Sequence, residues 1–252
     1  MIVRGEAVEQ LAGEQQAALA ELWQTRANSE RSVGSVFTQL VAELSATGAH
    51  AEVIALARRA MDDETRHARV CVELAAAYRG DEVREVTPLD VRLPDYGEPP
   101  RMRAALHAVN LCCIGETIAT AFVEACFAEC TAWPELRELH GLHLADEIHH
   151  ARVGWAHVAS LGDDERARIA TWLPELLRAQ VLGWESRIGT LPEHGVRGHG
   201  YPPRDALIAV VHAAIREVVL PGFDYVSVDT RTARAWFDEA RPVAPADPIA
   251  PA

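Results

Sequence analysis

The sequence predicts an all-α protein: a four-helix bundle with one long crossover connection and with extra N- and C-terminal helices. The 252-residue chain is rich in Ala, Leu, Val, Glu and Arg, and only 6% of its residues are aromatic, which is typical of helical globular proteins. Apolar residues recur at helical spacing along most of the chain. A stretch rich in Pro, Asp and Gly, residues 81–101, separates two pairs of helical patterns.

The first half of the chain contains three helical patterns. Asn28 and Ser29 are good helix caps, so we expect them to divide a first helix from a second. Gly48 ends the second helix, and Gly80 ends the third. The expected ranges are about 8–26, 28–46 and 50–78, followed by residues 81–101 as a surface connection.

The second half begins with another pair of helices, expected at about 101–131 and 134–161, where Pro134 suits a first helical turn. The two pairs give a bundle core at about 28–161. Further helices are expected at about 164–187, with a kink at Pro174, at 203–219, ended by Pro221, and at 230–240. We expect one domain over 1–240 and a disordered Pro/Ala tail at 241–252.

Composition excludes several functions. A net charge of −13 opposes binding to nucleic acids and to anionic membranes, so neither partner is expected. All 24 basic residues are arginine, which excludes a lysine Schiff base and a P-loop. The five cysteines lie in helical patterns without a CxxC, as expected for reduced core residues of a cytoplasmic protein. We expect no signal peptide and no apolar segment of membrane-spanning length.

One short pattern occurs twice, as DDETRHAR at 62–69 and as ADEIHHAR at 145–152. It places His67 three residues after Glu64, and His150 three residues after Glu147. At this spacing both side chains leave the same face of a helix. Two such pairs that meet across a bundle can hold two metal ions, with carboxylates that bridge them. Oxygen and nitrogen ligands of this kind suit iron or manganese.

Such a site needs one further carboxylate from each remaining helix. Glu30 lies on the apolar stripe of its helix, whereas Glu43 lies on roughly the opposite face. On the helix at 101–131, Glu116 lies on the apolar stripe. We therefore choose Glu30 and Glu116. Each half of the bundle then carries an acid followed by an acid–x–x–His pair, as in a degenerate internal repeat.

Three more residues can support this site. His143 precedes Glu147 by four residues on the same face. It is either a third nitrogen ligand, which we favour, or a hydrogen-bond donor to a ligand. Asp63 and Asp146 each precede a Glu of the repeated pattern, and they either orient an imidazole across the bundle or are plain surface acids.

The remaining histidines fall into three kinds. His140 is expected beside the ligands or in the core. His157 and His212 lie in apolar helices and are expected as core histidines with satisfied hydrogen bonds. His194 and His199 lie in a Gly-rich loop, so we expect them to be exposed.

With these residues, the chain resembles the ferritin-like di-iron carboxylate proteins over about residues 20–160. The added His143 makes it most similar to the p-aminobenzoate N-oxygenase group. The resemblance implies a di-iron site that activates O₂, with electrons from an external donor, and oxidises a small-molecule substrate, with an amine as the candidate. It also implies which residues hold each iron: Glu30, Glu64 and His67 one, and Glu116, Glu147, His150 and His143 the other, with Glu64 and Glu147 as bridges.

Several alternatives stay open. A Mn/Fe pair can replace two irons, and the resemblance suggests a homodimer. The function can instead be that of a ferroxidase or iron-handling protein, of a tRNA hydroxylase, or of a metal-binding protein without catalysis. The helices after residue 162 favour a covered site and hence an oxygenase, and the acidic charge disfavours tRNA. Cys112, Cys113, Thr120 and Phe127 are expected to line the substrate pocket.

Overall fold

The computed structural model describes residues 2, 5–87 and 89–242. Within this part the chain is all-α, as predicted, and no strand forms; an isolated antiparallel bridge joins Val196 and Tyr201. Most of the predicted tail, residues 243–252, lies outside the described residues. The elements are α1 (Glu6–Glu9), α2 (Gly13–Ala46), α3 (Ala51–Arg79), α4 (Pro100–Ala108), η1 (Val109–Glu116), α5 (Thr117–Glu129), α6 (Pro134–Ala159), α7 (Asp163–Gly189), α8 (Arg204–Ala214), η2 (Ile215–Val219), α9 (Leu220–Tyr225) and α10 (Arg231–Ala240).

The first two predicted helices are one helix, α2, so the predicted boundary at Asn28–Ser29 is wrong. No Gly or Pro interrupts residues 14–33, and the Asn28 side chain does not cap a helix. Its Oδ1 instead accepts a hydrogen bond from the backbone N–H of Thr87, at 3.0 Å. The helix propensity of these residues and the burial of one face therefore keep α2 helical at Asn28.

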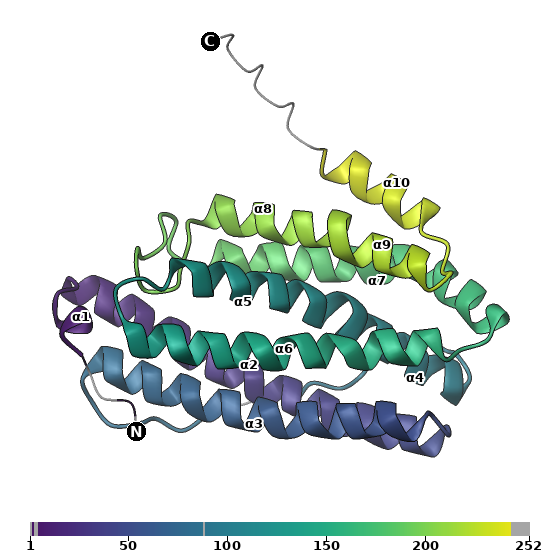
Figure 1. The fold of residues 1–252 in the computed structure, drawn as a ribbon, viewed down its shortest axis with the longest axis horizontal. Helices are drawn as coiled ribbons and strands as arrows, with labels where there is room; N and C mark the ends of the chain where they lie inside the picture. The colour runs from purple at the N-terminus through teal and green to yellow at the C-terminus, as the bar shows by residue number, and fades with distance from the viewer. Residues whose placement is uncertain (1, 3–4, 88, 243–252) are drawn as a thin grey trace, which may run out of the picture.

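The long helices lie lengthwise beside one another (Figure 1). α2 packs along α3, α6 packs against α5 and η1, and α3 also contacts α6. On the other side of α5 and α6 lie α7, α8 and α9, and α10 packs on α7. The two N-terminal long helices and the central pair thus enclose one interior, and the C-terminal helices cover the far side of η1 and α5.

The connection between α3 and α4 runs along α2, as five polar contacts show. Its described residues form no helix or strand, as predicted. Side chains spaced along α2 bond to its backbone: Asn28 to Thr87, Ser32 to Leu89 at 2.9 Å, and Gln39 to both Val91 at 2.8 Å and Leu93 at 3.2 Å. Gln24 adds a 3.3 Å bond to Glu85. The polar face of α2 therefore binds the connection between α3 and α4, while its other face is free to enter the interior.

Two helices contain π-helical turns. η1 lies between α4 and α5, so that 100–129 is one continuous helix. Gln180 of α7 donates a 2.9 Å hydrogen bond to the backbone carbonyl of Asn110, within η1. The second, η2, precedes Pro221, and α9 continues to Tyr225. The predicted end at Pro221 is thus wrong, because the wider ladder of η2 already departs from the i−4 bonds that a proline interrupts.

Two apolar clusters flank a polar layer in the interior. One cluster includes Trp23 and Ala27 of α2 with the C-terminal half of α3. The other includes Phe37 and Leu40 of α2 with the N-terminal half of α3 and Val153 of α6. Between them the buried residues of α2, α3 and α6 include several acids and histidines, described with the site below. These buried acids and histidines need charged or hydrogen-bonding partners, because an unpaired buried charge is costly.

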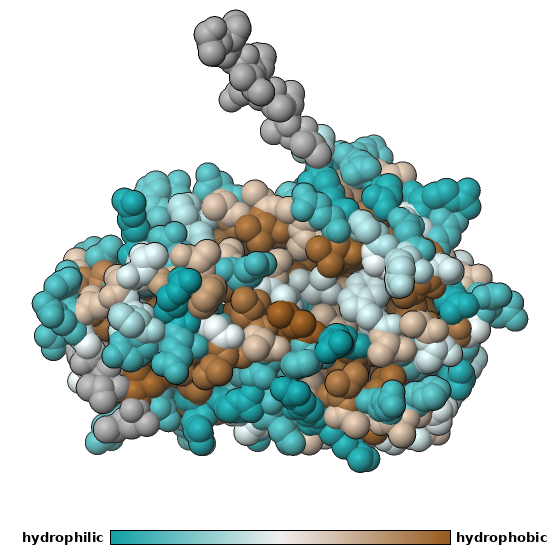
Figure 2. Space-filling view, in the orientation of Figure 1, coloured by the Kyte–Doolittle hydropathy of each residue, from teal (hydrophilic) through white to brown (hydrophobic). Residues whose placement is uncertain are grey.

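Two helices, Pro100–Glu129 and Arg204–Tyr225, are long and apolar enough to cross a membrane by length and composition. The expectation that no segment reaches this length is therefore wrong. Core helices of soluble proteins meet the same criterion, so the two helices by themselves give no location. Figure 2 shows hydrophobic side chains gathered over α5 and α6 amid a hydrophilic surface; Leu142 and Ile148 of α6 are among the exposed apolar residues.

Candidate metal centre

The structure brings all seven predicted ligand residues together in the polar layer. They form two groups in which the candidate ligand atoms lie within 4.8 Å of one another. We call these the Glu30 group and the Glu116 group. Among the described residues, Glu147 alone belongs to both. The Glu30 group is Glu30, His67, His143 and Glu147, and the Glu116 group is Glu64, Glu116, Glu147 and His150.

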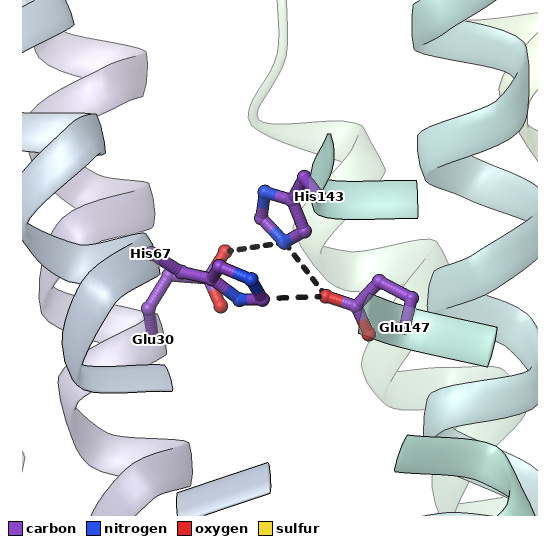
Figure 3. Close-up of side chains that lie close together, drawn as sticks. All are labelled: Glu30, His67, His143 and Glu147. Atoms are coloured by element: carbon purple, nitrogen blue, oxygen red, sulfur yellow. Dashed lines mark hydrogen bonds and ion pairs between the residues drawn. The ribbon is translucent and has the colours of Figure 1, made fainter. Parts of the chain in front are cut away.

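In the Glu30 group, three helices contribute side chains that point toward one another (Figure 3). His143 Nε2 lies 2.7 Å from Glu147 Oε1 and 3.7 Å from Glu30 Oε1. His67 Nδ1 lies 4.0 Å from the same Glu147 oxygen, and the rings of His67 and His143 stack with centroids 3.8 Å apart. Two imidazoles and two carboxylates thus converge on one point.

The Glu116 group is richer in carboxylates. His150 Nδ1 lies 3.1 Å from Glu64 Oε1 and 3.6 Å from Glu147 Oε2. Glu116 enters from the last residue of η1 and is buried, as are the other three. Gly34 of α2 lets α3 come close here, since a Cβ on Gly34 would lie 3.2 Å from Glu64 Cβ. Each oxygen of Glu147 therefore faces a different group.

The implied partition of ligands differs from the structure at His143. His143 lies with Glu30 and His67, and not with Glu116 and His150. The reason is that His143 sits two turns before His150 on α6, about 10 Å along the helix axis, so the two cannot reach the same point. Glu64 falls in the Glu116 group, but its Oε2 also lies 4.0 Å from His67 Nδ1, as Glu147 Oε1 does, so Glu64 and Glu147 are both placed between the two groups.

Asp63 and Asp146 reach the imidazoles across the interior. Asp146 of α6 has Oδ2 3.2 Å from His67 Nε2, and Asp63 of α3 has Oδ2 3.5 Å from His150 Nε2. Arg66 joins the two acids, with 2.9 Å to Asp63 and 2.5 Å to Asp146. Of the two contacts, the one between Asp146 and His67 is a hydrogen bond. An imidazole whose Nε2–H faces an aspartate presents Nδ1 to the centre, and it binds a metal there in its neutral form.

Sequence reasoning missed Arg26, one turn before Glu30 on α2. Its Nε donates a 2.9 Å hydrogen bond to Glu30 Oε1, and its Nη2 lies 3.3 Å from His143 Nε2. Although burial opposes ionisation of Glu30, His143 and the Arg26 guanidinium lower its pKa to about 2. The i, i+4 spacing of Arg26 and Glu30 was the available signal.

Within the described residues no arginine forms an ion pair with Glu64 or Glu116 of the Glu116 group, and the pKa values of these two acids are raised. Burial raises the pKa of Glu64 well above the usual range, and the charges of Glu30 and Glu147 raise it further. Burial and the charges of Glu147 and Glu64 act in the same direction on Glu116. Carboxylates this close cannot all ionise unless a positive charge joins them.

The imidazoles of His67 and His150, one from each copy of the repeated pattern, have pKa values shifted in opposite directions. Burial, reinforced by the charge of His143, lowers the pKa of His67 to about 4. Burial also opposes protonation of His150, but the adjacent Glu147 outweighs it and raises the pKa to about 9. His67 is therefore already in the form that binds a metal at neutral pH, whereas His150 would release a proton on binding.

The donor set fits a pair of divalent cations. Glu64 Oε2, Glu147 Oε2, His67 Nδ1 and His150 Nδ1 are all buried and have no hydrogen-bond partner in the described part of the chain. Buried polar atoms without partners are rare in native proteins and call for an explanation such as a bound ion. Oxygen and imidazole donors of this number suit iron or manganese.

A cavity of about 800 Å³ opens onto the carboxylate side of the site. Glu30, Glu64, Glu116 and Glu147 line it, and the histidines of the two groups do not. Its other walls come from α2, η1, α5, α7 and the loop before α8. They include apolar side chains and a few polar ones, among them Leu22, Val33, Leu111, Ala119, Phe122, Trp184, Gln180, Arg187 and Tyr201.

The pocket residues expected on the fourth helix are wrong. Cys112, Cys113, Thr120 and Phe127 do not line the cavity, whereas Leu111, Gly115, Ala119, Phe122 and Val123 do. For Cys112 and Cys113 the reason is that the expectation assumed 3.6 residues per turn, whereas the wider turns of η1 rotate them away from that stripe. All five cysteines are free and buried, as expected; Cys112 packs toward α2 and α3, and Cys113 toward α7.

The other histidines match expectation in part. His140 is buried outside both groups, with its ring 5.4 Å from that of Trp23. His194 is exposed, as predicted. His199 is buried and lies 2.9 Å from the hydroxyl of Tyr78, so its predicted exposure is wrong. Glycines with positive φ on both sides of it, Gly198 and Gly200, fold this loop inward.

His157 and His212 were expected to be satisfied core histidines. His212 Nε2 lies 2.8 Å from Glu185 Oε1, which agrees. His157 is buried, but neither ring nitrogen has a hydrogen-bond partner among the described residues. Burial lowers its pKa to about 4, so it stays neutral.

Comparison of the chain with known protein families, with curated proteins and with solved structures gives no match.

Proposed function

We propose that this protein is a non-haem di-iron oxygenase that activates O₂ to oxidise a small-molecule substrate, with an amine as the candidate. In this proposal α2, α3, α4–α5 and α6 form a ferritin-like four-helix bundle, and the connection along α2 is its crossover. Glu30, His67, His143 and Glu147 would hold one iron, and Glu64, Glu116, Glu147 and His150 the other. Bound iron would supply the activation of O₂, with electrons from an external donor.

The observation that carries this proposal is the cavity that ends on the four carboxylates. Its volume, about 800 Å³, lies in the range of small-molecule sites. Its walls are largely apolar, so they would hold the body of a substrate and exclude bulk water from the reacting end. The aspartates behind His67 and His150 would keep both imidazoles fixed while substrate binds on the opposite, carboxylate side.

The test uses protein loaded anaerobically with Fe(II) and supplied with a chemical reductant and a panel of aromatic and aliphatic amines. After addition of ¹⁸O₂, mass spectrometry should find ¹⁸O in a product, and iron uptake should stop at about two per chain, as for one two-metal site. Uptake of many irons per chain without a labelled product would instead identify a ferroxidase or iron-handling protein.

A cavity variant separates substrate binding from metal binding. Ala119→Trp fills part of the cavity from α5, so it should abolish labelled product and keep both irons. Ala128→Trp, on an exposed position of the same helix, is the matched control and should behave as wild type. Full activity in Ala119→Trp would show that substrate does not use this cavity.

A further inference from the structure

We propose that the two metal positions are unequal: Arg26 makes the Glu30 group the weaker one, and the Glu116 group binds its divalent cation first. This inference rests on the two-metal site of the proposed function, but not on oxygenase chemistry. It concerns the order in which the positions fill and the residue that sets it.

The ligands already favour the Glu116 group. It offers three carboxylates and one imidazole, whereas the Glu30 group offers two of each, and Glu147 is shared. Metal binding deprotonates its ligands, so a cation in the Glu116 group meets three carboxylate charges and one in the Glu30 group meets two. Burial strengthens this attraction because water screens it less. The group with more carboxylates is therefore the stronger one.

Arg26 increases the difference. Its guanidinium lies 2.9 Å from Glu30 Oε1, and both residues are nearly enclosed, with 13% and 11% of their side chains exposed. A metal at the Glu30 group must take that oxygen in competition with the guanidinium and must lie close to its positive charge. Both effects weaken binding at this position and act much less at the other.

The remaining arginines do not reverse this bias. Arg59 and Arg66 each contact both Asp63 and Asp146, so they act on the two groups alike. Arg187 lines the cavity, and its charge interacts with an acid of each group, Glu116 and Glu30. Within the described residues no arginine forms an ion pair with Glu64 or Glu116. Arg26 is thus the cation that distinguishes the two positions.

The Arg26 side chain has an alternative position available when a metal binds Glu30. Its side chain lines the cavity, and its guanidinium lies 5.5 Å from the centre of the Trp23 ring. A cation is stabilised over an indole ring. The second metal can therefore displace the guanidinium from Glu30 while the guanidinium stays in contact with the indole ring. The Glu30 group thus binds metal more weakly but can still bind it.

The test is an anaerobic titration of metal-free protein with Co(II), followed by calorimetry and by the visible absorption of Co(II). Wild type should bind in two steps of one ion each. Glu116→Ala should lose the tighter step, and Glu30→Ala the weaker one. Arg26→Gln should tighten the second step by about tenfold, or about 1.4 kcal/mol, with the first unchanged, whereas Arg26→Lys keeps the charge and should keep two separated steps.

Two equal steps in wild type, or an unchanged second step in folded Arg26→Gln, would overturn the inference and leave the proposed function intact. Loss of the weaker step in Glu116→Ala would also overturn it, because the order would be reversed. Should Arg26→Gln fail to fold by circular dichroism, the wild-type steps and the two glutamate variants still decide the order. If no Co(II) binds at all, the metal site, and with it the proposed function, is refuted.

Discussion

Replacement of Glu147 by alanine is the sharpest test of the two-metal arrangement, because each of its oxygens faces a different group. Oε1 lies 2.7 Å from His143 Nε2, and Oε2 lies 3.6 Å from His150 Nδ1. Truncation at Cβ removes a ligand and a negative charge from both positions. We therefore expect Glu147→Ala to lose both metals. Glu64→Ala should lose the metal of the Glu116 group and keep a weakened one at the Glu30 group, since Glu64 Oε2 also lies 4.0 Å from His67 Nδ1 but Glu147 remains.

The size of the stabilisation by metal follows from the preferential binding of metal to the native state. An ion that binds the native state at 100 times its Kd stabilises it by about 2.7 kcal/mol, so two ions contribute about 5 kcal/mol. For a chain of this length, each kcal/mol raises Tm by about 2–4 °C. Metal should therefore raise the Tm of wild type by roughly 10–20 °C, that of Glu64→Ala by about half as much, and that of Glu147→Ala hardly at all.

The assay is a thermal unfolding scan with and without Fe(II) under anaerobic conditions, paired with metal analysis of the desalted protein. Glu138→Ala is the matched control, since Glu138 is exposed on the same helix, and it should keep the full metal-induced shift. Two metals retained in Glu147→Ala, or a shift equal to that of wild type, would refute the assignment of Glu147 as the shared residue.

Three further perturbations have defined outcomes. Asp146→Asn should weaken metal binding about 10- to 100-fold without loss of fold, since it removes the carboxylate behind one imidazole; unchanged affinity in a metal titration would contradict this. The pKa of His157 falls from 6.5 to about 4 on folding, so the unfolded chain takes up this proton first and wild type should lose stability as pH falls through that window. His157→Leu should lessen that loss in urea unfolding at pH 4–7, and identical pH profiles would exclude His157 as its source. Gly154→Ala places a Cβ 2.6 Å from Cys113 Sγ and should lower the free energy of unfolding by about 1–3 kcal/mol. The control Gly183→Ala, with nothing within 4 Å of the added Cβ, should be neutral or stabilising. Equal Tm values for the two variants would show that α6 and η1 have room to separate.

The sequence predicted which acids and histidines meet in the interior, because their signal is local. Glu64 and His67 share a helical face through their spacing, and so do Glu147 and His150. Glu30 and Glu116 stood out because an acid on an apolar stripe has to be compensated. The structure brings all of these residues into one layer. Periodicity thus suffices to find which side chains enter the interior.

Periodicity did not reveal how the ligands divide or what surrounds them. The place of His143 depends on its height along α6 relative to Glu30, which is a relation between helices. The cavity wall on the fourth helix depends on the π-helical turns of η1, and Gln180 and Trp184 come from α7, far along the chain. His199 is buried by a loop whose glycines fold it inward. Each of these features is decided by tertiary packing.

The crossed aspartates have a consequence for how the protein opens. Asp146 on α6 is hydrogen-bonded to the imidazole of His67 on α3, and Asp63 on α3 lies 3.5 Å from the imidazole of His150 on α6. Neither helix can present its histidine in the right orientation once the other has moved away. Separation of α3 from α6 therefore disrupts both positions at once, so that bound metal should merge the two helices into a single cooperative unit with shared protection in native-state hydrogen exchange.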